Sequence, residues 1–515
     1  MGKIKNILLI IFVLFVSGTR VFAIDAWIND SRDLFTNNKA VIYGVNIRTF
    51  NAKDTNKNGI IEEDLGEERG TFLNAINRLD ELAAMGINTI HLLPVTPVGK
   101  TKAIGTAGSL YAPSDFGKLN PQFKSPNSSL SIENEMSKFV EECHRRKIRV
   151  IVEVPCCASY DLYLKRPELF KKDKLQNPII PMDWTDVRLL DAGDNEQINR
   201  DVYNLYDSFT ELVLNANVDG IIASEATLKP FAFWKELITK TRERNPQFLF
   251  LAKSTFSQKA AISEHATFTS CNKLLDAGFD GYYGNYFDLK NWKTAQDLFS
   301  NVKFDIGVSK KYSGLKSVVG NFVTHDQVSP ILVNGPQFSK MIIWLNATLP
   351  LNLYYIDGFP TGDNYIYPWA NQKAPKTFTD DDYYFAHRGQ LDIFNFSRKP
   401  VGNRFDIFSE LIMSNRFRLL SKNLISNGDF VILKTNSPSI FAYSRNYDDE
   451  SVLVFGNLDF KRTQQAVINV PKIKDSAYSI PIKINNIPVL LNGKVSTQLD
   501  PGEVQVIYYP RLSNQ

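Results

Sequence analysis

Short apolar segments alternate with amphipathic helices along most of this chain, and this alternation constrains its fold more than any other feature. Residues 73–82 place apolar side chains on one helical face, and Gly86 then predicts the end of that helix. Ser131 is a suitable N-cap for a helix that runs to Lys147, and residues 198–212 again show a helical stripe. The predicted strands are residues 40–46, 88–93, 149–154, 220–224, 248–252, 281–283, 318–322 and 351–355. Strands that alternate with helices form parallel β/α units, so the sequence predicts an eight-stranded TIM (β/α)8 barrel.

Two stretches depart from this alternation. Residues 156–194 follow the third predicted strand, contain several Pro and Asp residues and show no long periodicity, so we expect a small loop-rich insertion there. Residues 421–515 instead carry short alternating strands separated by turn residues such as Asn427-Gly428-Asp429. That pattern is typical of an antiparallel sheet, and it predicts a small C-terminal β-sandwich. The barrel is therefore assigned to residues 24–420.

The charge balance argues against one class of partner. The chain has 515 residues, with 59 Lys and Arg against 55 Asp and Glu, so the net charge is only +4. No block of basic residues stands out. We therefore expect no nucleic-acid partner.

The N-terminus has the pattern of a signal peptide. Lys3 and Lys5 precede an apolar run at residues 7–16, and Val21-Phe22-Ala23 resembles a small-x-Ala cleavage site. An uncleaved membrane anchor is the alternative, but the run is shorter than the roughly 20 apolar residues that a bilayer span needs. We expect residues 1–23 to be removed on export, which leaves a secreted or periplasmic protein without a stable membrane span.

The four cysteines do not form a disulfide framework for a chain of this size. They are Cys143, Cys156, Cys157 and Cys271. Neighbouring side chains on an extended segment point in opposite directions, so Cys156 and Cys157 are not expected to pair with each other. We expect buried thiols, although export would permit a disulfide.

Several phrases resemble the α-amylase family of glycoside hydrolases and occur in the order that this family shows. They are residues 46–50 (NIRTF), 86–95 (GINTIHLLPV), 108–112 (GSLYA) followed by Asp115, 120–121 (NP), and 321–327 (NFVTHDQ). The resemblance implies a TIM barrel with the family's small B domain at residues 156–194. It also implies that residues 421–515 correspond to the family's C-terminal domain.

The resemblance also assigns catalytic positions. In this family one carboxylate attacks the anomeric carbon while a second gives its proton to the leaving oxygen, and the two lie about 5 Å apart. By motif position the nucleophile falls on Ser224, the general acid on Lys253 and a third, sugar-orienting carboxylate on Asp326. Of the three, Asp326 alone is a carboxylate, so the resemblance implies an impaired enzyme.

Other motif positions differ as well. Ile222 stands where the family has an Arg, and residues 152–158, which end at Ala158, stand where the family has Asp followed by Asn-His. Glu225 could act as a shifted nucleophile, but a shift of one residue on a strand turns the side chain to the other face. Glu153 could replace the Asp of that motif, or it could be a carboxylate buried among polar groups of the barrel.

The resemblance places Tyr111 beneath a bound sugar and leaves His325 able to hydrogen-bond it. Other aromatic residues in the predicted mouth loops could stack on sugar faces or could simply pack, since aromatic side chains are first of all core material. They are Tyr160, Tyr163, Trp184, Tyr365, Tyr367 and Trp369.

Residues 54–62 (DTNKNGIIE) alternate oxygen-bearing side chains and place Gly at the sixth position, as calcium loops do. The candidate Ca²⁺ ligands are Asp54, Asn56, Asn58, Ile60 and Glu62. Position twelve is Leu65, which excludes a true EF-hand. A polar turn without metal is the alternative, and we expect no organic cofactor.

Three functions remain open. An impaired hydrolase could retain its barrel to bind an α-glucan oligosaccharide or polysaccharide, or a protein partner. An active retaining α-glycosidase or transglycosidase could use relocated groups, and a non-catalytic partner subunit is a third possibility. We favour the first, because two of the three expected carboxylates are replaced.

Overall fold

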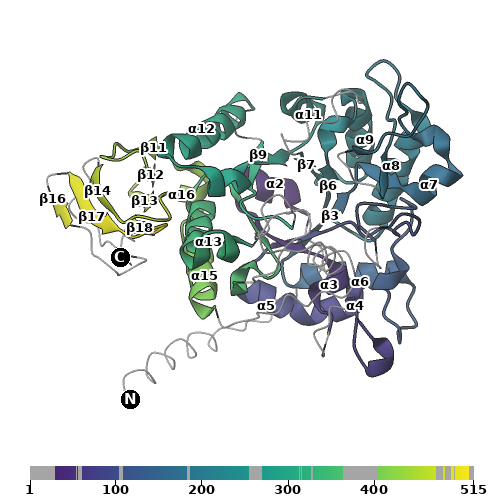
Figure 1. Cartoon of the computed structure of the whole chain (residues 1–515), viewed down its shortest axis with the longest axis horizontal. Coiled ribbons are helices and arrows are strands. Elements are labelled where there is room, and N and C mark those ends of the chain that lie inside the picture. The colour runs from purple at the N-terminus through teal and green to yellow at the C-terminus, as the bar shows by residue number, and fades with distance from the viewer. Residues whose placement is uncertain are drawn as a thin grey trace.

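The molecule is built around a closed barrel of eight parallel strands (Figure 1). The computed structural model describes residues 29–53, 55, 61–103, 108–181, 186–254, 269–312, 314, 316–325, 329–362, 404–470, 480–481, 489–491 and 493–509. The strand order around the barrel is β1-β10-β9-β8-β7-β6-β3-β2. The strands are β1 (Val41–Val45), β2 (Thr89–Leu92), β3 (Arg149–Val154), β6 (Gly220–Ser224), β7 (Leu249–Lys253), β8 (Gly281–Tyr283), β9 (Ser317–Gly320) and β10 (Asn352–Ile356). The TIM-barrel prediction is confirmed, and the predicted strand bounds agree within two residues.

Helices surround the barrel and separate its strands, as the sequence predicts (Figure 1). They are α2 (Ser31–Thr36), α3 (Ile47–Phe50), α4 (Phe72–Ala75), α5 (Leu79–Ala84), α6 (Ile132–Arg145), α8 (Arg200–Asn215), α9 (Phe231–Arg244), α11 (Cys271–Ala277), α12 (Ala295–Lys311), α13 (Pro330–Thr348) and α15 (Phe405–Leu420). The hydroxyl of Ser131 accepts a hydrogen bond from the Asn134 amide at 3.2 Å, which confirms the predicted N-cap of α6. Short 3-10 helices lie between the main elements, namely η1 (Glu63–Leu65), η2 (Ile76–Arg78), η3 (Pro121–Phe123), η4 (Pro167–Leu169), η6 (Ala226–Leu228), η8 (Tyr286–Asn291) and η9 (Phe359–Thr361).

The single helix predicted over residues 73–82 is wrong in detail, because η2 divides it into α4 and α5. The division ends at Arg78, whose buried guanidinium donates to the Phe50 carbonyl at 2.6 Å and to Asp357 at 3.2 Å. The spacing of apolar residues in a helix cannot predict these tertiary hydrogen bonds. Gly86 follows α5 with a left-handed φ of 81°, as expected for a residue that ends a helix.

The insertion after β3 is more ordered than predicted. Within the predicted loop-rich stretch, β4 (Cys157–Ser159) and β5 (Val187–Leu189) form a two-stranded antiparallel sheet, with α7 (Tyr160–Lys165) between them. Both strands are buried along their whole length. Strands of three residues are too short to show an alternating pattern, which is why the sequence suggests only a loop here.

Cys156 and Cys157 do not point in opposite directions as predicted. Their Sγ atoms lie 3.4 Å apart, because Cys156 occupies a bend and β4 begins only at Cys157. The alternation of an extended strand therefore does not apply to this pair. All four cysteines are free thiols, and three of them are buried.

The C-terminal region is the predicted β-sandwich, seen in yellow at one side of the barrel in Figure 1. One sheet has the order β11-β12-β13-β18-β15 and the other β14-β17-β16. A short helix, α16 (Lys422–Asn427), precedes them. The strands are β11 (Val431–Ile432), β12 (Ile440–Tyr447), β13 (Glu450–Asn457), β14 (Gln464–Asn469), β15 (Ile480–Pro481), β16 (Val489–Leu491), β17 (Lys494–Leu499) and β18 (Val504–Tyr509).

Both faces of β12 are buried along most of its length, which explains its apolar composition. Along β12, Phe441 and Tyr443 pack into the main core together with barrel residues. The alternate residues Ile440 and Ala442 belong to a second core, which also contains Ile468 of the smaller sheet. This period-two division is expected for a strand, and it joins the sandwich firmly to the barrel.

The predicted signal peptide at residues 1–23 lies outside the described residues, so its export role stays a prediction. Within the part of the chain that the structure describes, no helix combines the length and apolarity that a membrane span requires.

Asp305 of α12 should make stability depend on pH. It is buried, accepts hydrogen bonds from the hydroxyls of Tyr282 (2.5 Å) and Tyr286 (2.6 Å), and its pKa is raised to about 6, because burial outweighs both hydrogen bonds. The folded state therefore holds this proton between pH 4 and 6, where the unfolded state has lost it, and this stabilising contribution disappears as the pH rises through 6. Asp305→Asn removes this titrating group. The free energy of unfolding of the variant minus that of the wild type should therefore be about 2–3 kcal/mol larger at pH 7 than at pH 4. Denaturation at both pH values measures this, and a constant difference between the two proteins would contradict it.

Candidate functional site

Side chains from several strand ends converge on one carboxylate at the C-terminal end of the barrel. Ser224 and Lys253 are the last residues of β6 and β7 and face each other in register. Glu153 lies on β3, and His91 lies on β2. The C-terminal ends of barrel strands are where TIM barrels carry their functional groups, so this is the candidate site.

Glu153 is the centre of this group of residues. Its Oε1 accepts hydrogen bonds from the Ser224 hydroxyl and from Lys253 Nζ at 2.9 Å. Its Oε2 accepts from the Tyr111 hydroxyl at 3.0 Å and contacts His91 Nε2 at 2.9 Å. The Glu153 side chain has no exposed surface, whereas that of Lys253 is 13 % exposed. We call these five residues the Glu153 centre.

The electrostatics of the Glu153 centre favour an ionised carboxylate. Burial alone would raise the pKa of Glu153, but the charge of Lys253 and the hydrogen bond from His91 lower that pKa well below its ordinary value. Burial lowers the pKa of His91, so this ring is neutral near pH 7. A carboxylate can only accept, so we assign the ring proton to Nε2, which leaves Nδ1 to accept from the Tyr283 hydroxyl at 3.2 Å.

Tyr111 and His325 connect the Glu153 centre to the loop after β9. The Tyr111 hydroxyl lies 2.9 Å from His325 Nε2, and the two rings are stacked with centroids 5.5 Å apart. Lys253 Nζ lies 5.6 Å from the centroid of the Tyr111 ring. Both residues named for sugar binding are therefore brought to the same site as Ser224 and Lys253.

The other predicted catalytic residues are placed less directly. Asp326 lies outside the described residues, although its neighbour His325 is in the site. Glu225 lies one residue beyond β6 and is buried, with a left-handed φ of 42°. Ile222 is buried within β6, and Ala158 is buried on β4 opposite Arg188.

Two of the aromatic candidates lie in the ordered insertion. The Tyr160 ring lies 4.2 Å from Lys102 Nζ and 4.6 Å from Arg188 Cζ, and it packs against Tyr163 with ring centroids 5.6 Å apart. Both rings thus make packing contacts with their protein neighbours. Trp184, Tyr365, Tyr367 and Trp369 lie outside the described residues.

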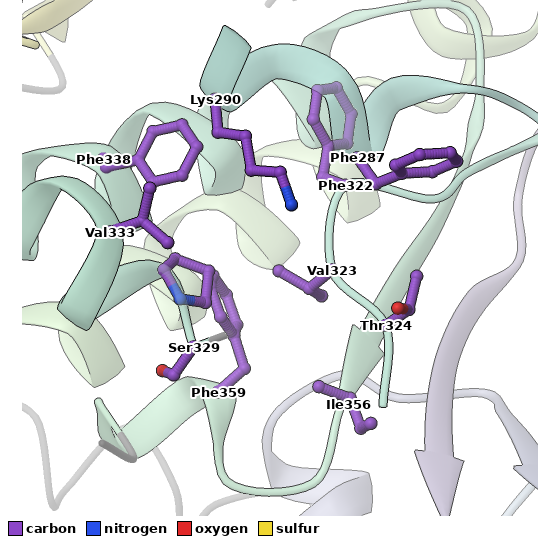
Figure 2. Close-up of a pocket in the computed structure, with 11 residues that line it drawn as sticks. Phe287, Lys290, Phe322, Val323, Thr324, Ser329, Val333, Phe338, Ile356 and Phe359 are labelled. Atoms are coloured by element: carbon purple, nitrogen blue, oxygen red, sulfur yellow. The ribbon is translucent and has the colours of Figure 1, made fainter. Parts of the chain in front are cut away.

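A pocket lies beyond the ends of β9 and β10 (Figure 2). Its cavity volume is about 20 Å³, which is room for about one water molecule. Four of the 11 residues that line it are aromatic, and Figure 2 shows the Lys290 side chain reaching into it above Val323. Thr324, which precedes His325, also lines it. The rings are Phe287, Phe322, Phe338 and Phe359.

The predicted calcium loop is only partly described. Asp54, Asn56, Asn58 and Ile60 lie outside the described residues, whereas Glu62 lies within them. The sequence prediction missed Glu67, whose buried carboxylate accepts from the Thr55 amide at 2.7 Å and the Glu62 amide at 3.0 Å. Glu67 thereby ties together the two ends of the loop. Among the described residues no cluster of three His, Cys, Asp or Glu side chains could hold a metal ion.

Sequence reasoning also missed His91 and Tyr283. Each is buried and belongs to the network around Glu153. The available signal was a His in the middle of the otherwise apolar strand at residues 88–93. A polar residue at such a position needs a buried partner.

Comparisons with known sequences find distant relatives. No protein-family model matches the chain. The chain is 25 % identical over 422 residues to alpha-1,4-glucan:maltose-1-phosphate maltosyltransferase 2 of Streptomyces coelicolor, covering 78 % of this chain and 58 % of that protein. It is 23 % identical over 433 residues to the enzyme of the same name from Myxococcus xanthus, covering 79 % and 59 %. The chain thus spans less than two thirds of these curated relatives.

Comparisons with solved structures find the same architecture. An alpha-amylase from Lactobacillus plantarum superimposes with a TM-score of 0.67 at 18 % identity, covering 92 % of this chain and 99 % of that one. A trehalose-6-phosphate hydrolase from Bacillus licheniformis gives a TM-score of 0.63 at 14 % identity, covering 92 % and 100 %. At these identities the likeness establishes the fold.

Proposed function

We propose, from the premise that this chain has the fold of the α-amylase family of glycoside hydrolases and resembles it in sequence, that it binds α-glucan oligosaccharides at the C-terminal end of its barrel. The relatives support the ligand class, since they are named as amylases and as α-1,4-glucan maltosyltransferases. We further propose that hydrolysis is impaired in this chain.

The proposal of impaired hydrolysis rests on the burial, the hydrogen bonds and the lowered pKa of Glu153. Retaining hydrolysis needs a nucleophile that reaches the anomeric carbon and an acid about 5 Å from it. Glu153 has no exposed surface and is covered by Ser224 and Lys253, so it cannot reach a sugar. Ser224 would need a base to become a nucleophile, and a carboxylate with a strongly lowered pKa is a weak base.

Sugar binding does not need those groups. Tyr111 and His325 offer a stacked pair of rings beside Glu153, and aromatic rings suit the apolar face of a glucose ring. Lys290 and Thr324 supply polar groups in the pocket of Figure 2.

Calorimetry tests the binding. We expect a maltooligosaccharide to bind the wild type, and Asp326→Ala to reduce its affinity at least about tenfold, because a charged hydrogen bond contributes about 1.5–3 kcal/mol. Asp33→Ala is the matched control, since Asp33 is an exposed residue of α2. The same helix contains Ser31, whose hydroxyl donates to Asp219 at the opposite end of the barrel. Equal affinities for all three proteins would move the ligand site away from the barrel mouth.

We also propose that residues 54–62 bind calcium. Its oxygen-rich composition suits a hard cation, and Glu67 already holds the two ends of the loop together. If the ion binds only the folded state, a concentration of 100 times Kd stabilises the protein by about 2.7 kcal/mol. We therefore expect millimolar Ca²⁺ to raise the Tm relative to excess chelator, and Glu67→Gln to reduce that rise. A Tm that is the same with calcium and with chelator would contradict the proposal.

The alternative is an active glycosidase or transglycosidase with relocated catalytic groups. It predicts turnover that depends on Asp326, and the activity measurement described in the Discussion separates it from the binding proposal.

A further inference from the structure

Two thiols lie in contact just beyond β3, outside the Glu153 centre. The Sγ atoms of Cys156 and Cys157 are 3.4 Å apart. Cys156 is 5 % exposed and Cys157 is 2 % exposed. A disulfide bond is about 2.05 Å long, so the two sulfur atoms must approach by about 1.4 Å, and the bond is strained because adjacent Cα atoms are only about 3.8 Å apart.

The pair occupies a junction between the insertion and the barrel mouth. Both thiols belong to an apolar cluster that includes Ala112, Leu189 and Leu228. Ala112 follows Tyr111 of the Glu153 centre, Leu189 belongs to β5, and Leu228 ends the short helix that follows Ser224. The thiols therefore contact the same small core as two segments that shape the candidate site.

A buried cation lies beside the pair. Lys229 is 1 % exposed, and its Nζ donates to the Cys156 carbonyl at 3.1 Å and lies 4.6 Å from the centroid of the Tyr206 ring. The pKa of Cys156 is lowered, first by its hydrogen bond with Cys157 and then, against the effect of burial, by the charge of Lys229. The same hydrogen bond raises the pKa of Cys157 well above its ordinary value. Cys156 is also the more exposed of the two, so we expect it to react first.

We propose that Cys156 and Cys157 are a redox-active dithiol, which a small-molecule disulfide such as oxidised glutathione converts into an intramolecular disulfide. The Cys156 thiolate attacks one sulfur of the small disulfide and releases one thiolate. Cys157 then attacks the Cys156 sulfur of the mixed disulfide and releases the second. The two thiol protons go to the two released thiolates, so the protein loses two hydrogens and the small disulfide is reduced to two thiols.

Oxidation of this pair acts on local structure rather than on overall stability. A disulfide stabilises mainly by closing a loop in the unfolded chain, and adjacent residues enclose no loop. The new bond instead restrains the peptide unit at which β4 begins. We expect little change in Tm and a change in the hydrogen exchange of the β4 amides.

The experiment uses the full chain with Cys143→Ser and Cys271→Ser, which removes the other two thiols. The folded protein is incubated with oxidised glutathione, acid-quenched, unfolded and treated with N-ethylmaleimide. We expect intact mass spectrometry to show a protein that has lost two hydrogens and carries no maleimide and no glutathione. The tryptic fragment Val150–Lys165, which contains both cysteines, should carry the bond.

Single variants test the order of the two steps. With Cys157→Ser we expect Cys156 to retain one glutathione, because no second thiol resolves the mixed disulfide. With Cys156→Ser we expect the more buried Cys157 to end with maleimide instead. Two maleimides on the oxidant-treated parent protein, or a stable glutathione adduct on it, would overturn the proposal, and so would an intermolecular disulfide in place of the internal one.

Discussion

Replacement of Glu153 by Gln should destabilise the folded protein by about 3–5 kcal/mol, the cost of removing one partner of a buried ion pair. Lys253 would lose its counter-ion, and the new amide group would face hydroxyl and imidazole donors that now point at a carboxylate. The free energy of unfolding from guanidinium denaturation measures the effect. It should rank among the largest of any single substitution in the barrel.

Two further variants make this test specific. Glu243→Gln makes the same Glu-to-Gln change at an exposed residue of α9. It should change the free energy of unfolding by less than about 0.5 kcal/mol. Glu153→Gln combined with Lys253→Met should cost less than the two single changes added together, because each single change leaves its partner unpaired. Additive costs, or a loss below about 1 kcal/mol in Glu153→Gln, would show that the Glu153 centre is not a coupled unit.

Wild-type protein should hydrolyse maltooligosaccharides and aryl α-glucosides at no more than the background rate. Loss of general-acid catalysis alone costs roughly 10²–10⁴-fold, and the nucleophile position is also changed. Release of reducing sugar or of the aryl group measures this. Turnover that disappears in Asp326→Ala would overturn the proposal of impaired hydrolysis and favour relocated catalytic groups.

Ser224→Asp combined with Lys253→Glu is the stricter activity test. The two residues end neighbouring strands in register and both contact Glu153, so their side chains point the same way. Neighbouring strands lie about 4.8 Å apart, close to the roughly 5 Å that retaining chemistry requires. We expect measurable hydrolysis, together with a lower Tm because three carboxylates then share one site. A silent variant would place the defect in the binding positions, with Ile222 and Ala158 examined first.

The sequence alone determined the architecture well. Barrel strands are buried on both faces, so each appears in the sequence as a short apolar run whose ends can be predicted within two residues. The caps at Ser131 and Gly86 are local features and were confirmed for the same reason. The sandwich was predicted from alternation, which is also a local feature, as the alternately exposed and buried residues of β17 show.

Only the tertiary structure decided the state of the site. The sequence left Glu153 as either a substitute catalytic group or a buried carboxylate, and it did not single out His91 as a partner. Closure of the barrel brings residues 91, 111, 224 and 253 onto the Glu153 carboxylate, and no local pattern records which side chains meet across such distances along the chain. Three other features also could not be predicted from local sequence patterns. They are the contact between Cys156 and Cys157, the division of a predicted helix near Arg78 and the hydrogen bonds of Glu67 to both ends of its loop. Apolar burial fixes where strands and helices form, because it acts residue by residue, whereas pairing of polar groups depends on how distant segments meet.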